Sequence, residues 1–290
     1  MGDPDENVHR ALYARQILAK AGIARDERLE TAFAKVRRED FLGPPPWLVS
    51  DLQQYKELAS SDPAMLYQDM VVSLDAFRRV NNGMPSLHAL ALHRLGIREG
   101  ETVVHLGAGT GYYTAIMAEL VGESGRVIGV EYDGALVDRA HAALAGLDQA
   151  KVVHADALRQ GWVEGEADVI YANFALDHPP ALWVETLSVG GRLLFPFGVP
   201  APGSRATFSR WAAFLMIDRR AGSFGARFLA PVSFIWAEDT EPPPEGRHAA
   251  LTEAFKGGGL SRVRSFRWQA PARGAEWYGE EPWGLSFDEV

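Results

Sequence analysis

The stretch of residues 101–133 constrains the fold of this chain more than any other part. A short apolar run, typical of a buried parallel strand, leads directly into Gly107, Gly109 and Gly111. A segment with helical periodicity follows, and a second apolar run then ends at Glu131. This order predicts one β-α-β unit with a ligand site at the carboxyl ends of its strands.

The spacing of the glycines bears on which ligand that site takes. A dinucleotide turn needs G-x-G-x-x-G, but here the pattern is G-x-G-x-G, and Tyr112 stands in place of the third dinucleotide glycine. S-adenosylmethionine has no pyrophosphate to hold, and Glu131 stands where an acid would accept hydrogen bonds from both ribose hydroxyls. We therefore favour S-adenosyl-L-methionine over two alternatives, a dinucleotide cofactor and glycines that serve only a tight turn.

The rest of the chain alternates between helical and strand patterns. Periodicity predicts two helices within residues 8–38, a third at 85–95, and a short helix at 50–59 in the irregular region between them. Two late β-rich runs, 207–218 and 225–237, predict a hairpin. We expect an α/β fold with a Rossmann-like, doubly wound, mostly parallel seven-stranded sheet, an antiparallel edge strand, N-terminal helices and a C-terminal extension.

Changes in composition divide the chain into three expected parts. Proline-rich breaks precede the core, and the tail is dense in aromatic residues, which predicts that it packs on its own domain. The parts are an N-terminal helical and irregular segment that covers the site (1–80), an S-adenosylmethionine-binding methyltransferase core (81–238) and an aromatic-rich C-terminal extension (239–290).

Composition also narrows the partners and the location. The net charge of −9 argues against a nucleic-acid partner, and no apolar run approaches the length of a membrane span. The 290 residues contain no cysteine, which fits a reducing cytoplasm and excludes thiol catalysis. No metal site is expected, because His88 and His93 have the wrong spacing for one helix face. We expect a cytoplasmic protein without a membrane partner.

Six short motifs follow one another along the chain, each occurring once. They are a basic-acidic-Phe motif at 36–41, an aromatic-x-Asp at 67–69, a segment in register with I-S-x-P-x-x-H-A at 82–89, the glycine turn at 107–112, a D-x-x-x-x-G-W pattern at 156–162 and G-G-R-L-x-x-P-x-G at 190–198. Together they resemble the protein-L-isoaspartate O-methyltransferases, a family of class I S-adenosylmethionine-dependent methyltransferases, over about residues 10–237. This chain looks like a divergent member.

The resemblance implies a set of cofactor-binding residues at the ends of the first four core strands. Asp156 follows the third strand, where such folds bind the adenine amino group, and Asn173 ends the fourth. The expected cofactor-binding residues are Gly107, Ala108, Gly109, Thr110, Gly111, Tyr112, Glu131, Tyr132, Asp156, Ala157 and Asn173.

The catalytic segment departs from the family pattern in two places. Gly83 replaces the family's hydroxyl residue, beside Asn82 in place of isoleucine, and the loop after the fourth strand carries Asp177 and His178. A carboxylate acceptor is ionised at neutral pH and needs no base, whereas an alcohol or ammonium acceptor needs one, a role open to His178. These four residues are the catalytic candidates.

The predicted function is that of an S-adenosylmethionine-dependent O-methyltransferase acting on a carboxylate of a peptide or protein. Because Gly83 lacks a hydroxyl, we expect isoaspartyl methylation to be weak. One alternative is a methyltransferase of the same fold with a different acceptor, an oxygen or nitrogen of a modified peptide or small molecule. Another is a non-catalytic cofactor-binding protein that serves recognition. The oligomeric state is left open.

Overall fold

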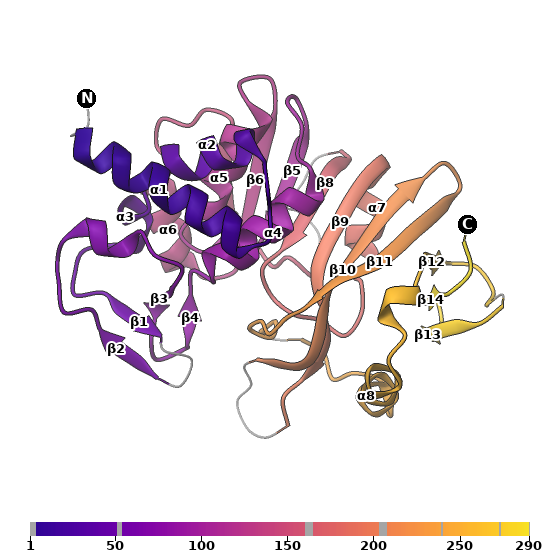
Figure 1. Ribbon diagram of the computed structural model, residues 1–290. Helices are drawn as coiled ribbons and strands as arrows, with labels where there is room; N and C mark the ends of the chain where they lie inside the picture. Colours follow the sequence, from indigo (N-terminus) through magenta and orange to yellow (C-terminus); the bar gives the residue numbers. More distant parts are fainter. Residues whose placement is uncertain are drawn as a thin grey trace. The chain divides into compact units, whose positions relative to one another are not determined.

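The structure, a computed structural model, describes most of the chain, namely residues 4–50, 54–159, 165–202, 208–238, 240–272 and 274–289. The chain forms two compact units, Met1–Ala157 and Leu158–Val290 (Figure 1). The glycine and tryptophan that close the expected motif at 156–162 lie outside the described residues. The three-part division expected from composition stays a prediction.

The described part of the first unit is rich in helices. They are α1 (Pro4–Lys20), α2 (Glu27–Lys35), α3 (Glu39–Leu42), α4 (Pro85–Leu95), α5 (Tyr112–Val121) and α6 (Gly134–Ala143), with a 3-10 turn η1 (Pro63–Leu66). The predictions of a helical pair and of a helix at 85–95 are confirmed. The Asp26 carboxylate caps α2 by accepting a hydrogen bond from the Leu29 amide at 3.1 Å, and a left-handed Gly96 ends α4. Helix α1 packs against α2 and α4, and α2 packs against α5 (Figure 1).

Three parallel strands form the centre of this unit, in the order β5 (Thr102–Leu106), β6 (Arg126–Glu131) and β7 (Ala150–His154). Leu106 lies opposite Val130, and Glu131 lies opposite His154. The carboxyl ends of the three strands therefore meet at one edge, which is where open α/β sheets bind ligands.

A small antiparallel sheet with the order β2-β1-β3-β4 lies at the lower left of Figure 1. Its strands are β1 (Leu48–Ser50), β2 (Tyr55–Glu57), β3 (Val71–Asp75) and β4 (Val80–Asn81). The expected short helix at 50–59 is wrong, because β1 pairs with β2 and β3 here. Val49 and Leu58 pack on a cluster that includes Trp47 and Val72, so tertiary packing outweighs local helical periodicity.

A completely buried arginine connects the N-terminal helices to the chain that leads into β3. The Arg38 guanidinium donates hydrogen bonds to the carbonyl oxygens of Leu66 at 2.6 Å, Gln68 at 2.8 Å and Met70 at 2.6 Å. These carbonyls lie outside regular strands, so the guanidinium supplies donors that no sheet partner provides. The basic-acidic-Phe motif thus has a structural role in this chain.

The second unit is built on strands in the order β8-β9-β10-β11-β12-β14-β13. Strands β8 and β9 are parallel and the others pair antiparallel, so the predicted late hairpin, β10 with β11, is confirmed. The strands are β8 (Ala167–Ala172), β9 (Leu187–Pro200), β10 (Ser209–Arg220), β11 (Ser223–Pro231), β12 (Ser265–Trp268), β13 (Glu276–Glu280) and β14 (Trp283–Ser286). The helices are α7 (Ala181–Thr186) and α8 (Arg247–Gly257), with a 3-10 turn η2 (Leu260–Arg262).

The C-terminal extension continues this sheet. Strand β12 pairs with β11, and the ring of Phe197 in β9 lies 6.2 Å from that of Phe255, 6.4 Å from Trp277 and 5.8 Å from Trp283, measured between centroids. Such edge-to-face and tilted contacts stabilise a core beyond the burial of apolar area alone. The aromatic density of the tail therefore reflects packing within its own unit, as the sequence predicted.

Replacing Arg38 tests how much the buried guanidinium contributes. We expect Arg38→Met to lower the free energy of unfolding by about 3 kcal/mol, because three carbonyl oxygens lose charged donors. Arg37→Met is the matched control: its side chain is 46% exposed and its partner Glu39 is also bound by the Tyr67 hydroxyl, so the loss should stay below about 1 kcal/mol. Urea denaturation measures both, and equal losses would contradict the assignment.

Candidate functional site

The glycine turn after β5 lies directly against the end of β6. The amides of Gly107 and Ala108 both donate to the carbonyl oxygen of Val130, at 2.9 and 3.1 Å. Further along, the amide of Ala155 donates to the carbonyl oxygen of Glu131 at 3.0 Å. The predicted cofactor-binding segments after β5, β6 and β7 are therefore brought together at one edge of the sheet.

Glu131 is the charged group at the centre of this edge. Its side chain accepts hydrogen bonds from the Gly109 amide at 2.7 Å and from the Asp133 amide at 2.9 Å, one on each carboxylate oxygen. The residue is 9% exposed, and burial raises its pKa above the ordinary value, although these two amides act in the opposite direction. Each oxygen keeps a further lone pair, so the group can accept from a ligand as well.

Gly109 is favoured by its backbone conformation. Its φ is +56°, a left-handed conformation that side chains rarely adopt, and a Cβ there would lie 3.4 Å from Leu74 Cδ1. Strand β3 therefore packs against the glycine turn. Without a side chain at this point a ligand could approach the backbone closely, although the Gly109 amide itself is bound to Glu131.

The hairpin of β3 and β4 is also tied to the edge by charge. Arg78, in the turn between these strands, forms an ion pair with Asp133, which caps α6 through the amides of Ala135 and Leu136. The hydrogen bonds to Asp133 and the charge of Arg78 outweigh burial, so the pKa of Asp133 lies below its ordinary value. Arg78 was not singled out from the sequence, because nothing local to residue 78 indicates a partner 55 residues away.

The other expected cofactor-binding residues of the first unit differ in exposure. Ala108, Thr110 and Ala157 are buried, whereas Tyr132 is 48% exposed beside the turn. The Tyr112 ring is buried in the core, with its hydroxyl 3.4 Å from that of Tyr13 in α1. Tyr112 can therefore meet a ligand with its backbone only. Asp156 lies in the loop after β7, and Gly111 lies at the start of α5.

The candidate catalytic segment, residues 82–86, is held in place by Asp69 of the aromatic-x-Asp motif. Asp69 accepts hydrogen bonds from the Ser86 amide at 2.8 Å and the Ser86 hydroxyl at 2.7 Å, and it pairs with Lys20 at 2.9 Å. Asn82 accepts a hydrogen bond from the Val72 amide at 2.9 Å with its side-chain oxygen. Its buried side-chain nitrogen has no hydrogen-bond partner among the described residues. A buried donor of this kind is costly unless a ligand or water satisfies it.

Gly83 provides room for a histidine. Its φ is +71°, and a Cβ at this position would clash with the ring of His88 in α4, which stacks on Tyr113 at a centroid distance of 3.8 Å. Burial, with smaller effects of His105 and Arg38, holds the pKa of His88 well below its ordinary value. A neutral imidazole thus fills the space that a side chain at residue 83 would take.

Three of the candidates belong to the second unit. Asp177 and His178 follow β8, and Nδ1 of His178 lies 2.6 Å from a carboxylate oxygen of Asp177, so the predicted pair does form a hydrogen bond. Asn173 directly follows β8. The carboxyl end of a parallel strand is a usual place for ligand contacts. A role for these three residues in cofactor or acceptor binding stays a prediction.

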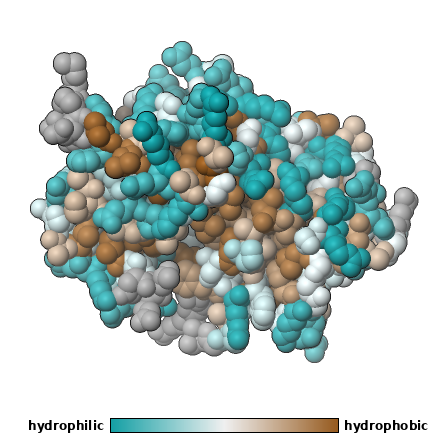
Figure 2. Space-filling model, viewed as in Figure 1, coloured by the Kyte–Doolittle hydropathy of each residue, from teal (hydrophilic) through white to brown (hydrophobic). Residues whose placement is uncertain are grey.

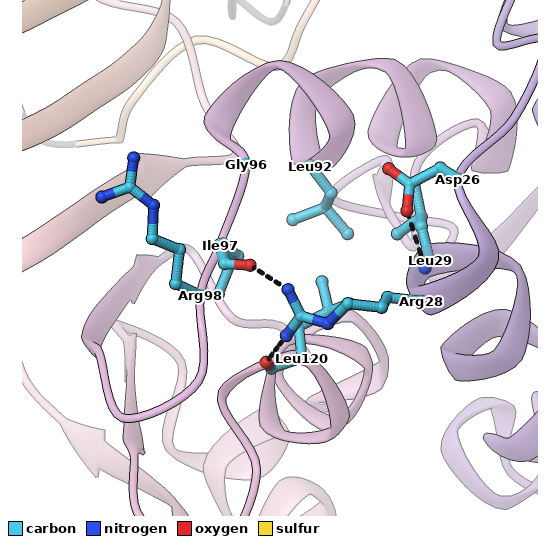
Figure 3. Close-up of a pocket in the computed structure, with 8 residues that line it drawn as sticks. All are labelled: Asp26, Arg28, Leu29, Leu92, Gly96, Ile97, Arg98 and Leu120. Carbon is cyan, nitrogen blue, oxygen red and sulfur yellow. Dashed lines mark hydrogen bonds between the residues drawn. The ribbon is translucent and has the colours of Figure 1, made fainter.

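The pocket shown in Figure 3 lies elsewhere in the first unit, where the beginning of α2 meets the ends of α4 and α5. The Arg28 guanidinium points into it and donates to the carbonyl oxygens of Ile97, at 2.9 Å, and Leu120. Arg98 is directed away from this guanidinium. The donors of Arg28 therefore satisfy a carbonyl in the last turn of α5 and one just after α4, which is a structural role.

Within the described ranges, no group of three or more histidine and acidic side chains is arranged to hold a metal ion. None of the helices that the structure describes combines the length and apolarity needed to cross a membrane. The face in Figure 2 shows hydrophobic side chains interspersed with hydrophilic ones.

Comparison with known proteins identifies the relatives of this chain. Residues 10–237 match the model of the family described as protein-L-isoaspartate(D-aspartate) O-methyltransferase. An Archaeoglobus fulgidus protein-L-isoaspartate O-methyltransferase 2 is 37% identical over 39% of this chain and 53% of its own length. A Thermotoga maritima protein-L-isoaspartate O-methyltransferase is 29% identical over 63% of this chain and 54% of its own length. The chain thus spans about half the length of these two relatives.

A solved structure supports the same fold. A Plasmodium falciparum protein described as a protein-L-isoaspartate O-methyltransferase, in complex with S-adenosyl-L-homocysteine, has a TM-score of 0.61 at 20% identity, over 80% of this chain and 99% of the other. The expected Rossmann-like α/β fold is confirmed. With the family model matching residues 10–237, this chain belongs to the protein-L-isoaspartate(D-aspartate) O-methyltransferase family.

Proposed function

We propose that this chain is an S-adenosyl-L-methionine-dependent methyltransferase that methylates a carboxylate of a peptide or protein. The observation that carries the proposal is the Glu131 carboxylate, held between the amides of Gly109 and Asp133 at the ends of the first two core strands. Family membership supports the same reaction class. The absence of cysteine and the net charge of −9 favour a cytoplasmic location and a partner other than nucleic acid.

The residues at this edge fit the cofactor. Glu131 would accept hydrogen bonds from the ribose hydroxyls, and Gly109 would allow the amino-acid end to approach the backbone. Tyr132, Asp156 and Ala157 would border the adenine. When bound, the sulfonium supplies an already activated methyl group, so the protein has mainly to orient the acceptor and exclude water.

Asn82 is the group best suited to hold a carboxylate acceptor. Its buried side-chain nitrogen has no hydrogen-bond partner among the described residues, and the family's hydroxyl is missing from the adjacent Gly83. An amide N–H can donate to a carboxylate oxygen as a hydroxyl does. The acceptor itself is ionised at neutral pH and needs no base.

A second candidate function is favoured by the short hydrogen bond between Asp177 and His178. We propose it for an acceptor with an ionisable proton, such as a hydroxyl or an ammonium group. Nε2 of His178 would take that proton while the acceptor atom bonds to the methyl carbon. The methyl–sulfur bond would break with its electron pair left on sulfur, and the proton would pass to solvent. Formation of S-adenosylhomocysteine with an acceptor distinguishes either enzyme from a non-catalytic binding protein.

Glu131→Ala tests the cofactor assignment. We expect the Kd for S-adenosylhomocysteine to rise about 100-fold, since two charge-assisted hydrogen bonds are lost. Glu123→Ala, at an exposed turn after α5, is the control and should leave the Kd unchanged. Isothermal titration calorimetry measures both variants, after circular dichroism has verified their folding. An unchanged Kd in Glu131→Ala would move the ligand away from this edge.

Gly83 leads to a prediction about the acceptor. We expect methyl transfer to an isoaspartyl peptide to be on the order of 100-fold slower than with the Thermotoga maritima relative, because the family's hydroxyl is missing at residue 83 and the proposed donor on Asn82 is buried. A radiolabelled transfer assay at matched enzyme concentration measures the difference. Equal rates would show that Asn82 or backbone amides suffice.

The same assay can locate the cause. Gly83→Ser alone should not help, because its Cβ would clash with His88. Gly83→Ser combined with His88→Ala makes room for the hydroxyl and should raise the rate. If the double variant stays slow, the loss lies outside this segment.

A further inference from the structure

A cluster of charged side chains surrounds Asp177 in the second unit. The carboxylate side chain is only 7% exposed and is approached by His178 Nδ1 at 2.6 Å, His248 Nε2 at 2.8 Å and Arg247 Nη1 at 3.5 Å. His178 is its neighbour in the loop after β8. Arg247 and His248 belong to the first turn of α8, in the extension that lies beyond the family match at residues 10–237.

Arg247 is itself fixed from the other side. Its Nε and Nη2 bind the two carboxylate oxygens of Glu280 at 3.0 and 2.6 Å, a bidentate arrangement that sets the guanidinium plane. The Tyr278 hydroxyl and the Trp283 indole donate to the same carboxylate at 3.1 and 3.0 Å. Strands β13 and β14 thus hold the arginine that approaches Asp177.

This arrangement determines the protonation pattern around Asp177. Burial would raise the pKa of Asp177, but the hydrogen bond and charge of His178, the charge of Arg247 and the hydrogen bond of His248 lower it below the ordinary value. A carboxylate only accepts hydrogen bonds, so the imidazole nitrogen that faces it carries the proton. Two groups approach Nδ1 of His178, the Asp177 oxygen at 2.6 Å and Arg247 Nη1 at 3.4 Å, and the much shorter contact with the carboxylate sets the tautomer. In neutral His178 the proton is therefore on Nδ1, which leaves Nε2 as the acceptor on a side chain that is 38% exposed.

We propose that Arg247 and His248 are positioning residues, through which the C-terminal extension fixes the rotamer and tautomer of His178 at the end of β8. The two side chains orient Asp177, and Asp177 in turn orients His178. The effect of these residues on rate rests on the proposed methyl transfer. For an acceptor that must lose a proton, the C-terminal extension would be part of the site, because it orients His178. An isoaspartyl carboxylate would not depend on it.

The test begins with the tautomer, which does not depend on activity. Long-range proton–nitrogen spectra of the full-length, nitrogen-15-labelled protein should show His178 with its proton on Nδ1. His248→Ala and Arg247→Met should shift the ratio of the two tautomers about tenfold toward the Nε2-protonated form. His248→Gln should restore the ratio, because its amide can donate to Asp177. Lys256→Met, in the same helix and paired only with Glu253 at the surface in the described residues, is the control with the same change of charge.

A measurement of activity distinguishes the positioning role of Arg247 and His248 from the proposed methyl transfer. Radiolabelled transfer is measured on one peptide that carries isoaspartate and on matched peptides with serine or lysine at that position. In His248→Ala, kcat for a hydroxyl or amine acceptor should fall at least about tenfold without a matching rise in KM. A wild-type His178 protonated on Nε2, or tautomers unchanged in both Arg247→Met and His248→Ala, would overturn the positioning role. If the tautomers shift but the wild type modifies no peptide, the positioning role stands and the proposed methyl transfer to these acceptors fails.

Discussion

The fully buried guanidinium of Arg38 is the interaction on which the first unit depends. It binds three carbonyl oxygens of a segment that has no strand partner, and buried carbonyls need donors. That segment contains Asp69, which binds Ser86 beside the candidate catalytic residues, and it continues into β3, which packs against Gly109. The Arg38 side chain therefore fixes the course of the chain toward both the glycine turn and the segment around Asn82 and Gly83.

The parts of the fold that follow from short-range pattern could be predicted from the sequence. The glycine turn and the strands on either side of it lie within one stretch of chain, and their spacing reflects backbone geometry near Gly109 and Glu131. The region at 50–59 could not be predicted in this way. Strand β1 exists because β3 pairs with it and because an apolar cluster with Trp47 covers it, both of which are contacts distant in sequence.

The candidate site shows the same division. The pair of Asp177 and His178 could be picked out because the residues are adjacent in a loop after a predicted strand. Arg247 and His248 could not, since they lie 70 and 71 residues further along the chain. The clash between His88 and a side chain at Gly83 also could not be predicted, because it depends on the placement of the His88 ring, which local periodicity does not determine.

The position of Glu131 has a consequence for turnover. As the proposed ligand of the ribose, Glu131 would lose little further rotamer entropy on binding, because its two oxygens are already bound to backbone amides. A ribose held there belongs equally to the methylated and the demethylated cofactor. Such an anchor cannot tell fresh cofactor from spent. Tighter binding of the ribose would then also strengthen inhibition by the demethylated product. Only the residues around the sulfur could favour exchange of the product for fresh cofactor.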